Sequence, residues 1–108
     1  MSSFWLTIRG LISKGASRIS EHGFQKLRQD DIHLVELLQG LETAQIVEEY
    51  PDYHKGPCVL VFQRDAKGGP VHVLWGTSTT NPAEATLITA YRPDPKLWSA
   101  DFLRRLPK

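Results

Sequence analysis

The connections between four strand-like segments limit how this chain can fold. Each segment is short, rich in Val, Ile, Thr and aromatic residues, and bounded by Pro or Gly, which is typical of β-strands. They are Ala44–Tyr50, Cys58–Arg64, Val71–Gly76 and Ala85–Tyr91. Every connection between them is shorter than the roughly dozen residues that a parallel crossover needs. The sequence therefore predicts an antiparallel meander of four strands.

A first helix is predicted at the N-terminal end of the chain. Apolar residues recur at steps of three and four from Phe4 to about His22, which places them on one stripe of an amphipathic helix. Gly10 and Gly15 lie inside this stretch and weaken it, so the helix is either broken there or needs close backbone packing. Gly23 is expected to end the helix, because a residue without Cβ enters the left-handed region easily.

A second helix and a C-terminal segment complete the predicted fold. The helix is expected from Asp30, whose side chain can cap it, through Leu41. Residues 95–105 are expected to form a short helix or a docked tail. The prediction is an α+β fold with two N-terminal helices packed on one face of a four-stranded antiparallel sheet. With 108 residues the chain suffices for one domain, assigned to 1–108.

The composition is that of a globular cytoplasmic protein. Hydrophobic residues make up 41% and charged residues 23% of the chain, close to ordinary usage. No apolar run approaches the roughly 18 residues that span a bilayer, and the first residues lack the pattern of a signal peptide. A single cysteine, Cys58, excludes an intrachain disulfide and a multi-cysteine zinc site. We expect a cytoplasmic location and no membrane partner.

The net charge of +1 hides an uneven distribution. Residues 30–54 hold seven acids and no Lys or Arg, whereas the stretches before and after them are basic. The pI of about 7.9 lies below the value of about 9 that is typical of dedicated nucleic-acid binders. A broad phosphate-binding surface is therefore disfavoured. A local basic groove and ordinary solvated faces both stay open.

Motifs for metal or nucleotide cofactors are missing. The four histidines are spaced too widely to form a His-x-x-x-His pair. The sequence also has no phosphate-binding glycine loop, no dinucleotide fingerprint and no nucleophile elbow. We therefore expect no cofactor and no metal site.

A catalytic site is predicted at one end of the meander. Strand order brings Arg64, His72, Tyr91 and Arg92 to this end, with Gln63 opposite His72 if the hairpin is symmetric. His72 alternates with the core residues of its strand and is expected to face solvent. Arg binds phosphate bidentately and His titrates near neutrality, so the group suits metal-independent cleavage of RNA. Ordinary surface and edge contacts are the alternative.

Two further groups are candidates for contact with RNA. Lys14 and Arg18 lie close together on the predicted first helix, where a salt bridge to Glu21 explains them equally well. His54 and Lys55 belong to a loop between two prolines, which suits recognition as well as a tight turn.

Five segments carry a resemblance to a known family. They are Arg18–Gly23, Val47–Tyr53, Gly56–Val61, Pro70–Gly76 and Leu87–Pro93. Their most telling pieces are the EYPDY turn, the HVxWG strand and the TAYRPDP end. Over roughly residues 14–105 the chain resembles a bacterial family of small domains, the domain of unknown function 4258 family, which is grouped with RelE/ParE/BrnT-like toxins.

The resemblance implies a RelE-like fold with an active surface of basic residues, His or Tyr on the open face of the sheet. The motif positions in this chain are Arg18, Glu21, His72, Tyr91 and Arg92. Many relatives have a His-Ala pair where Lys14-Gly15 stands here, so an activity that depends on that His would be altered or lost. By analogy, an antitoxin-like protein partner is expected.

Two hypotheses about function remain open. The first is a toxin component that acts as a metal-independent endoribonuclease, with His72 as general acid or base, Arg64 and Arg92 on the scissile phosphate, and Tyr91 orienting or stacking a base. The second is a non-catalytic protein-binding module of the same fold. A small-molecule binder ranks last, because the sequence has no recognisable pocket signature. The expected partners are RNA and an antitoxin-like protein.

Overall fold

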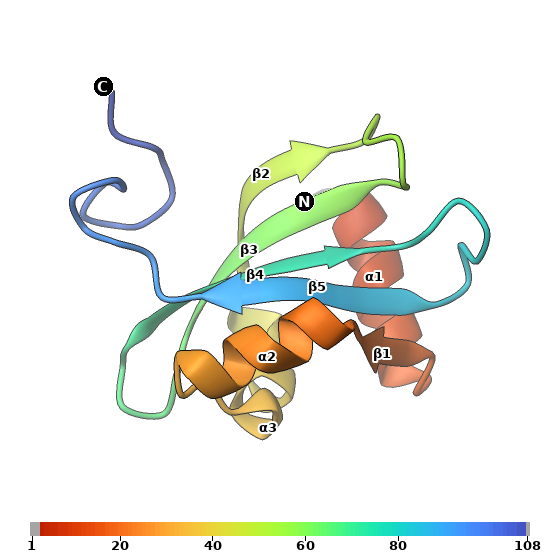
Figure 1. Ribbon diagram of the computed structural model, residues 1–108, viewed down its shortest axis with the longest axis horizontal. Helices are drawn as coiled ribbons and strands as arrows, with labels where there is room; N and C mark the ends of the chain where they lie inside the picture. Colours follow the sequence, from red (N-terminus) through yellow and green to blue (C-terminus); the bar gives the residue numbers. More distant parts are fainter. Residues whose placement is uncertain (1–2, 108) are drawn as a thin grey trace.

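The computed structural model describes residues 3–107 and shows an α+β fold with a five-stranded sheet (Figure 1). In chain order the elements are α1 (Ser3–Ser13), β1 (Ser17–Ile19), α2 (Glu21–Gln29), α3 (Leu34–Gln39), the 3-10 helix η1 (Leu41–Thr43), β2 (Gln45–Tyr50), β3 (Cys58–Arg64), β4 (Pro70–Gly76) and β5 (Ala85–Tyr91). The strand order is β1-β5-β4-β3-β2. Strands β2 to β5 form the antiparallel meander that the short connections predict.

Strand β1 was not expected, and it makes the sheet mixed. It pairs in parallel with the start of β5, with Ser17 opposite Ala85. The expected helix over 4–22 is confirmed only as far as Ser13, where α1 ends, and the break that was left open falls at Gly15, which turns the chain with φ 76°. A residue without Cβ adopts this conformation at little cost. The parallel pairing is possible because the chain between β1 and β5 is much longer than the dozen or so residues that a parallel connection needs.

Helix α2 begins where the first helix was expected to end. The Ser20 hydroxyl caps it by accepting the Gly23 N–H at 2.9 Å, and it also donates to the Ile88 carbonyl. Gly23 therefore lies in the first turn of α2, and its expected role as a stop is wrong. The residue lets the helix approach β5 closely, because a Cβ at this position would lie 2.7 Å from the Leu87 carbonyl oxygen.

The second predicted helix is shorter than expected. Asp30 ends α2 rather than starting a new helix, since its backbone N–H bonds to the Lys26 carbonyl. Asp31 then takes the left-handed conformation with φ 52° and turns the chain. Helix α3 covers only six residues of the expected stretch, followed by η1.

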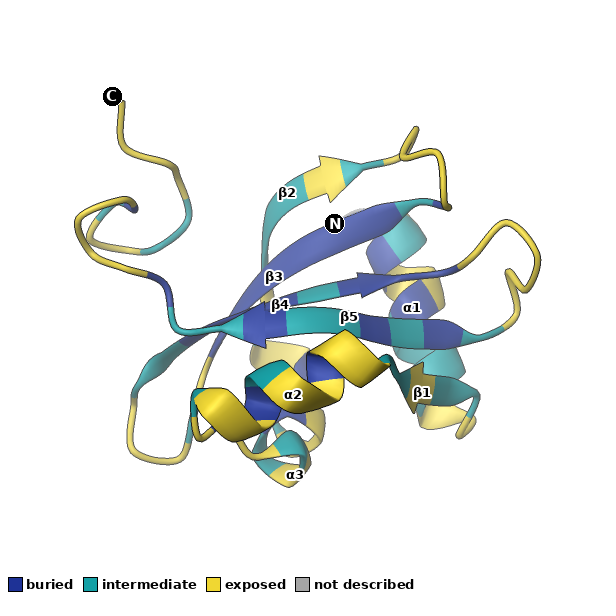
Figure 2. Cartoon of the chain, in the orientation of Figure 1, coloured by how far each residue is buried: buried dark blue, intermediate teal, exposed yellow. Residues whose placement is uncertain are grey.

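The core lies between the helices and one face of the sheet. Val71, Val73 and Trp75 form the expected core row of β4, with exposed fractions of 0%, 0% and 2%. The helices contribute Trp5, Ile8, Leu27 and Leu37 to the same cluster. Figure 2 shows this division, with buried residues along the central strands and exposed ones on the outer faces of the helices. The prediction that the helices cover one face of the sheet is confirmed.

The C-terminal segment, residues 93–107, is a docked tail, one of the two expected forms. Figure 1 shows it on the side of the sheet away from α2 and α3. A bridge between Trp98 and Arg105 and a hydrogen bond from the Leu106 N–H to the Leu97 carbonyl fold it back on itself. None of the helices among the described residues combines the length and the apolar character that crossing a membrane requires.

The two helical glycines Gly10 and Gly23 give a matched test of this packing. Nothing lies within 4 Å of a Cβ built on Gly10, so Gly10→Ala should raise the free energy of unfolding by about 0.5 to 1 kcal/mol through helix propensity. Gly23→Ala should lower it despite the same gain, because the methyl group meets the Leu87 carbonyl. Urea unfolding measures both, and equal stabilisation by the two substitutions would contradict the close approach of α2 and β5.

Candidate functional site

His72 and Tyr91 form the centre of the candidate site. They face each other across β4 and β5 in the sheet register. The Tyr91 hydroxyl lies 3.2 Å from His72 Nδ1, and the Phe102 carbonyl lies 2.8 Å from His72 Nε2. A carbonyl oxygen can only accept, so Nε2 carries the proton and donates it to Phe102. Nδ1 is then the acceptor for the Tyr91 hydroxyl.

The expectation that His72 faces solvent is wrong. Its strand face is the predicted one, opposite the core row, but its exposed fraction is 0%. The ring of Trp98 packs edge-on at 4.5 Å between centroids, and Phe62 packs edge-on from the neighbouring strand at 6.0 Å. The C-terminal segment thus covers the imidazole, which can reach a ligand only through Tyr91.

Burial sets the protonation of this pair. It lowers the pKa of His72, against a smaller opposing effect of the hydrogen bond to Phe102, and so favours a neutral imidazole near pH 7. Burial also raises the pKa of Tyr91 to about 12, so the phenol keeps its proton. The pair therefore rests as a neutral donor and a neutral acceptor.

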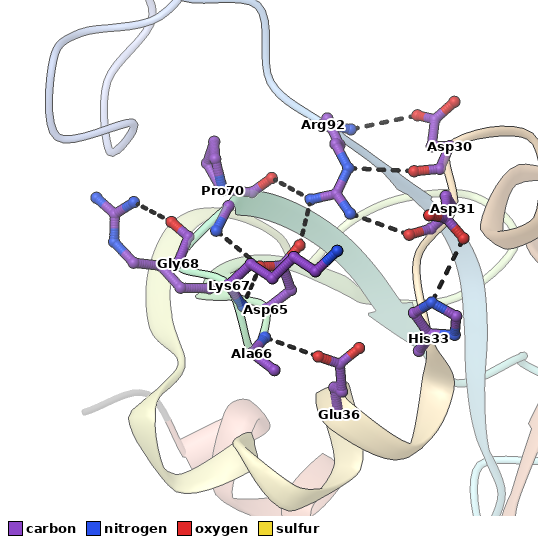
Figure 3. A network of polar contacts seen from close by, with 12 residues as sticks. Asp30, Asp31, His33, Glu36, Asp65, Ala66, Lys67, Gly68, Pro70 and Arg92 are labelled. Atoms are coloured by element: carbon purple, nitrogen blue, oxygen red, sulfur yellow. Dashed lines mark hydrogen bonds and ion pairs between the residues drawn. The ribbon is translucent and has the colours of Figure 1, made fainter.

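Arg92 points away from this pair and stabilises the opposite side of the sheet. Its guanidinium donates to the carbonyls of Asp30 and Asp31 at 3.1 and 3.0 Å, and it pairs with the Asp65 carboxylate at 2.9 Å (Figure 3). Successive residues of an extended chain point to opposite faces, so Arg92 cannot share the face of Tyr91. The expected grouping of Arg92 with His72 is therefore wrong.

Arg64 and Gln63 also depart from the expected cluster. The register places Phe62, not Gln63, opposite His72, and the Gln63 amide is buried on the helix side, where it donates to the Leu37 carbonyl. Arg64 is exposed at the hairpin and donates to the Gly68 carbonyl at 2.9 Å. Its guanidinium lies 5.2 Å from the centre of the Phe62 ring.

Two adjoining cavities form a groove on the open face of the sheet, which we call the sheet groove. The first, of about 340 Å³, is lined by Tyr50, Tyr53, Cys58, Leu60, Leu74, Ile88, Thr89, Tyr91 and Arg105. The second, of about 260 Å³, is lined by Arg18, Tyr53, Lys55, Gly56, Cys58, Gly76, Thr77, Ser78, Thr86 and Ile88. They share Tyr53, Cys58 and Ile88, so they lie next to each other. Burial raises the pKa of the shared thiol, Cys58.

The sheet groove contains part of the predicted RNA-binding set. Arg18 and Lys55 both line its second cavity, although Arg18 lies on a strand and not on the expected helix. The His54 ring is 4.6 Å from the Tyr53 ring, but His54 is not among the residues that line the groove. Lys14 is exposed just after α1 and is not among the residues that line the groove.

Sequence reasoning missed a charged cluster at the other end of the groove. Arg105 binds Glu48 through Nε and Nη2, at 2.8 and 3.0 Å, and the Tyr50 hydroxyl donates to the same carboxylate. These contacts with Arg105 and Tyr50 hold the pKa of Glu48 below its ordinary value. Glu48 and Tyr50 are two residues apart on β2, so strand periodicity could have placed them on one face. Nothing in the sequence brings Arg105 to them.

Comparison with known proteins identifies the family of this chain. A family model described as Domain of unknown function (DUF4258) matches residues 19–92, which is more than half of the chain. The chain therefore belongs to this family, as the motifs indicated. No curated protein and no solved structure matches it. The matched stretch ends before the C-terminal segment that covers His72.

Buried His72 predicts a loss of stability on acidification. Its pKa is lowered in the folded chain, so below the ordinary value of about 6.5 the unfolded chain binds more protons than the folded chain. The free energy of unfolding therefore decreases as the pH is lowered. Chemical denaturation between pH 7.5 and 5 measures this slope. His72→Gln should make the free energy of unfolding less dependent on pH. His54→Gln, at an exposed position, should leave this pH dependence unchanged. An unchanged slope in the His72 variant would contradict the burial.

Arg92 is predicted to be a stability residue. Arg92→Ala removes an ion pair and leaves the Asp30 and Asp31 carbonyls without this donor, so it should lower the free energy of unfolding by about 2 to 3 kcal/mol. The exposed Arg64 is the matched control, and Arg64→Ala should cost only about 0.5 kcal/mol. Equal losses in thermal or urea unfolding would rule out the special role of Arg92.

Proposed function

We propose that this chain is the toxin component of a bacterial toxin–antitoxin pair and cleaves RNA, without a metal ion, on the open face of its sheet. The observation that carries the proposal is the sheet groove, whose second cavity is lined by Arg18 and Lys55, from distant segments, together with Tyr53. Tyr53 also lines the first cavity, beside Tyr50 and Tyr91. Cations that track a phosphate backbone, together with aromatic rings that stack bases, are what single-stranded RNA binding requires. The proposal includes the assignment of this fold to the RelE-like toxins.

The charge of the groove supports binding of a polyanion. Arg18 and Lys55 line one cavity and Arg105 lines the other, where it is paired with Glu48. The stretch between them has an apolar floor, which fits bases rather than phosphates. The groove is thus a local basic site within a chain of nearly balanced charge.

Tyr91 is the group in the groove that can touch the reacting ribose, with His72 as the positioning residue behind it. In the proposed step the ribose 2′-hydroxyl gives its proton to the Tyr91 oxygen while the Tyr91 proton passes to His72 Nδ1. The 2′-oxygen bonds to phosphorus, the bond to the 5′-oxygen breaks, and that oxygen takes a proton from water. The hydroxide so formed recovers the proton held on His72 through Tyr91, which restores the neutral pair. The neutral imidazole is ready to accept a proton at neutral pH.

A non-catalytic, protein-binding role is the second candidate, and a groove on the helix side favours it. Apolar residues of β1, α2, α3 and the chain between the helices line this groove. Two of them, Phe24 and Val35, are 53% and 64% exposed. An antitoxin-like partner could bury these side chains whether the chain is a ribonuclease or a binding module. A chain that binds a partner through them and leaves RNA intact would have this second function.

The decisive experiment is cleavage of single-stranded RNA by the purified chain, combined with growth arrest on its expression. The Tyr91→Phe variant keeps the ring and loses the hydroxyl, so cleavage should fall by about 100-fold or more. RNA binding should change little, because the cations of the groove are intact. Thr7→Val, which removes a hydroxyl from α1 on the helix side, is the control and should cleave normally.

The same assays can overturn the proposal. A wild-type chain that neither cuts RNA nor arrests growth is not a ribonuclease toxin. If cleavage survives in Tyr91→Phe, the groove lacks the proposed relay. Chelating agents should leave the wild-type rate unchanged, and loss of cleavage on their addition would refute the metal-independent step.

A further inference from the structure

The first cavity of the sheet groove has the features of a site for a flat ring. Its lining combines aliphatic and thiol side chains of the central strands with the phenol rings of Tyr50, Tyr53 and Tyr91. Its volume of about 340 Å³ lies within the range of small-molecule sites, roughly 300 to 1,000 Å³. Apolar floors with phenol walls favour planar aromatic ligands, which stack on the rings or pack edge-on against them.

Arg105 gives this cavity a positive charge at its edge. Glu48 holds the guanidinium from one side, and the Trp98 ring lies 4.7 Å below it. The side chain is still 61% exposed, so an anion can reach it from solvent. Because Nε and Nη2 already donate to Glu48, a phosphate would bind at the remaining edge of the guanidinium, formed by Nη1 and the second N–H of Nη2.

The C-terminal segment is what positions Arg105. Trp98 is 4% exposed against His72, and the Phe102 carbonyl accepts from the same imidazole. The segment thus crosses β4 and delivers Arg105 to β2. It lies outside residues 19–92, the stretch that the family model matches. The tyrosine walls Tyr50 and Tyr91 lie inside that stretch, so the cavity is completed by a segment beyond it.

We infer that this cavity holds one unpaired nucleotide, with its base against the tyrosine rings and its phosphate on Arg105. The inference rests on the proposed function and narrows its substrate class to RNA with an unpaired nucleotide at the cleaved site. Base-paired RNA does not fit, because its bases are stacked within the helix. The C-terminal segment is therefore a part of the binding site and not only a cover for His72.

Binding of 5′-UMP to the full chain tests the inference. The backbone amide signals of Tyr50, Tyr53 and Tyr91 should shift together in a titration followed by NMR. Uridine and inorganic phosphate, which carry the base and the anion separately, should each bind at least about tenfold more weakly, because each lacks one of the two contacts.

Neighbouring arginines provide a matched pair of variants. Arg105→Gln should weaken 5′-UMP about tenfold by removing the phosphate contact. Arg104→Gln, with the same loss of charge one residue earlier, should leave the affinity within about twofold, because Arg104 is not among the residues that line the cavity. Tyr53→Leu, in an exposed loop that leaves the C-terminal segment untouched, should weaken 5′-UMP and uridine alike.

The outcomes separate this inference from the proposed function. If single-stranded RNA binds and 5′-UMP does not, or if both arginine variants behave alike, the nucleotide site is refuted while RNA binding stands. If 5′-UMP binds as described and RNA is neither bound nor cut, the cavity is a mononucleotide site and the ribonuclease proposal fails. Tyr53→Leu with unchanged affinity would exclude stacking in the cavity.

Discussion

The buried imidazole of His72 couples the sheet to the C-terminal segment. It is the only side chain in the described structure that bonds both to β5, through the Tyr91 hydroxyl, and to the last part of the chain, through the Phe102 carbonyl. Unpaired, each polar atom of this ring would carry the desolvation penalty of a buried group. Both are paired only when the segment lies across β4. The position of Arg105, and with it the shape of the sheet groove, follows from this contact.

Successive residues at the end of β5 point to opposite faces of the sheet, and the two faces have different contacts. Tyr91 faces the groove, while Arg92, the next residue, joins the hairpin at Asp65 to the turn at Asp30 and Asp31. One side therefore carries the exposed aromatic and basic groups, and the other uses its arginine to tie loops together. Substitutions at adjacent positions consequently affect separate contacts, the bond to His72 for Tyr91 and the links between loops for Arg92.

The strands could be predicted from sequence because their signals are local. Pro and Gly bound each segment, the connections allow only antiparallel pairing, and the core row of β4 follows from strict alternation. Gly15 indicated a possible break of the first helix, but the strand β1 after it was less accessible, since apolar spacing continues through β1. Its pairing with β5 depends on a partner far along the chain. The predicted pairing of Gln63 with His72 was also wrong, by one residue. The β3–β4 hairpin begins with Arg64 opposite Pro70, so Gln63 lies on the helix side of the sheet.

The candidate site was predictable only in part. The meander correctly brings His72 to Tyr91, and the loop residue Lys55 does line the groove. The burial of His72 was not predictable, because alternation tells which face a residue takes and not whether a distant segment lies on that face. Arg105 was missed because its partner Glu48 is separated from it by most of the sheet.

The parallel pairing of β1 with β5 bears on how the chain reaches its native state. Strand β1 has its hydrogen-bonded partner 68 residues later, since Ser17 lies opposite Ala85. The hairpins of the meander can form from near neighbours, whereas this pairing requires closure of a loop that contains almost the whole sheet. Such non-local contacts slow folding. During synthesis the N-terminal strand must therefore wait, as an unpaired edge, until the last strand has left the ribosome.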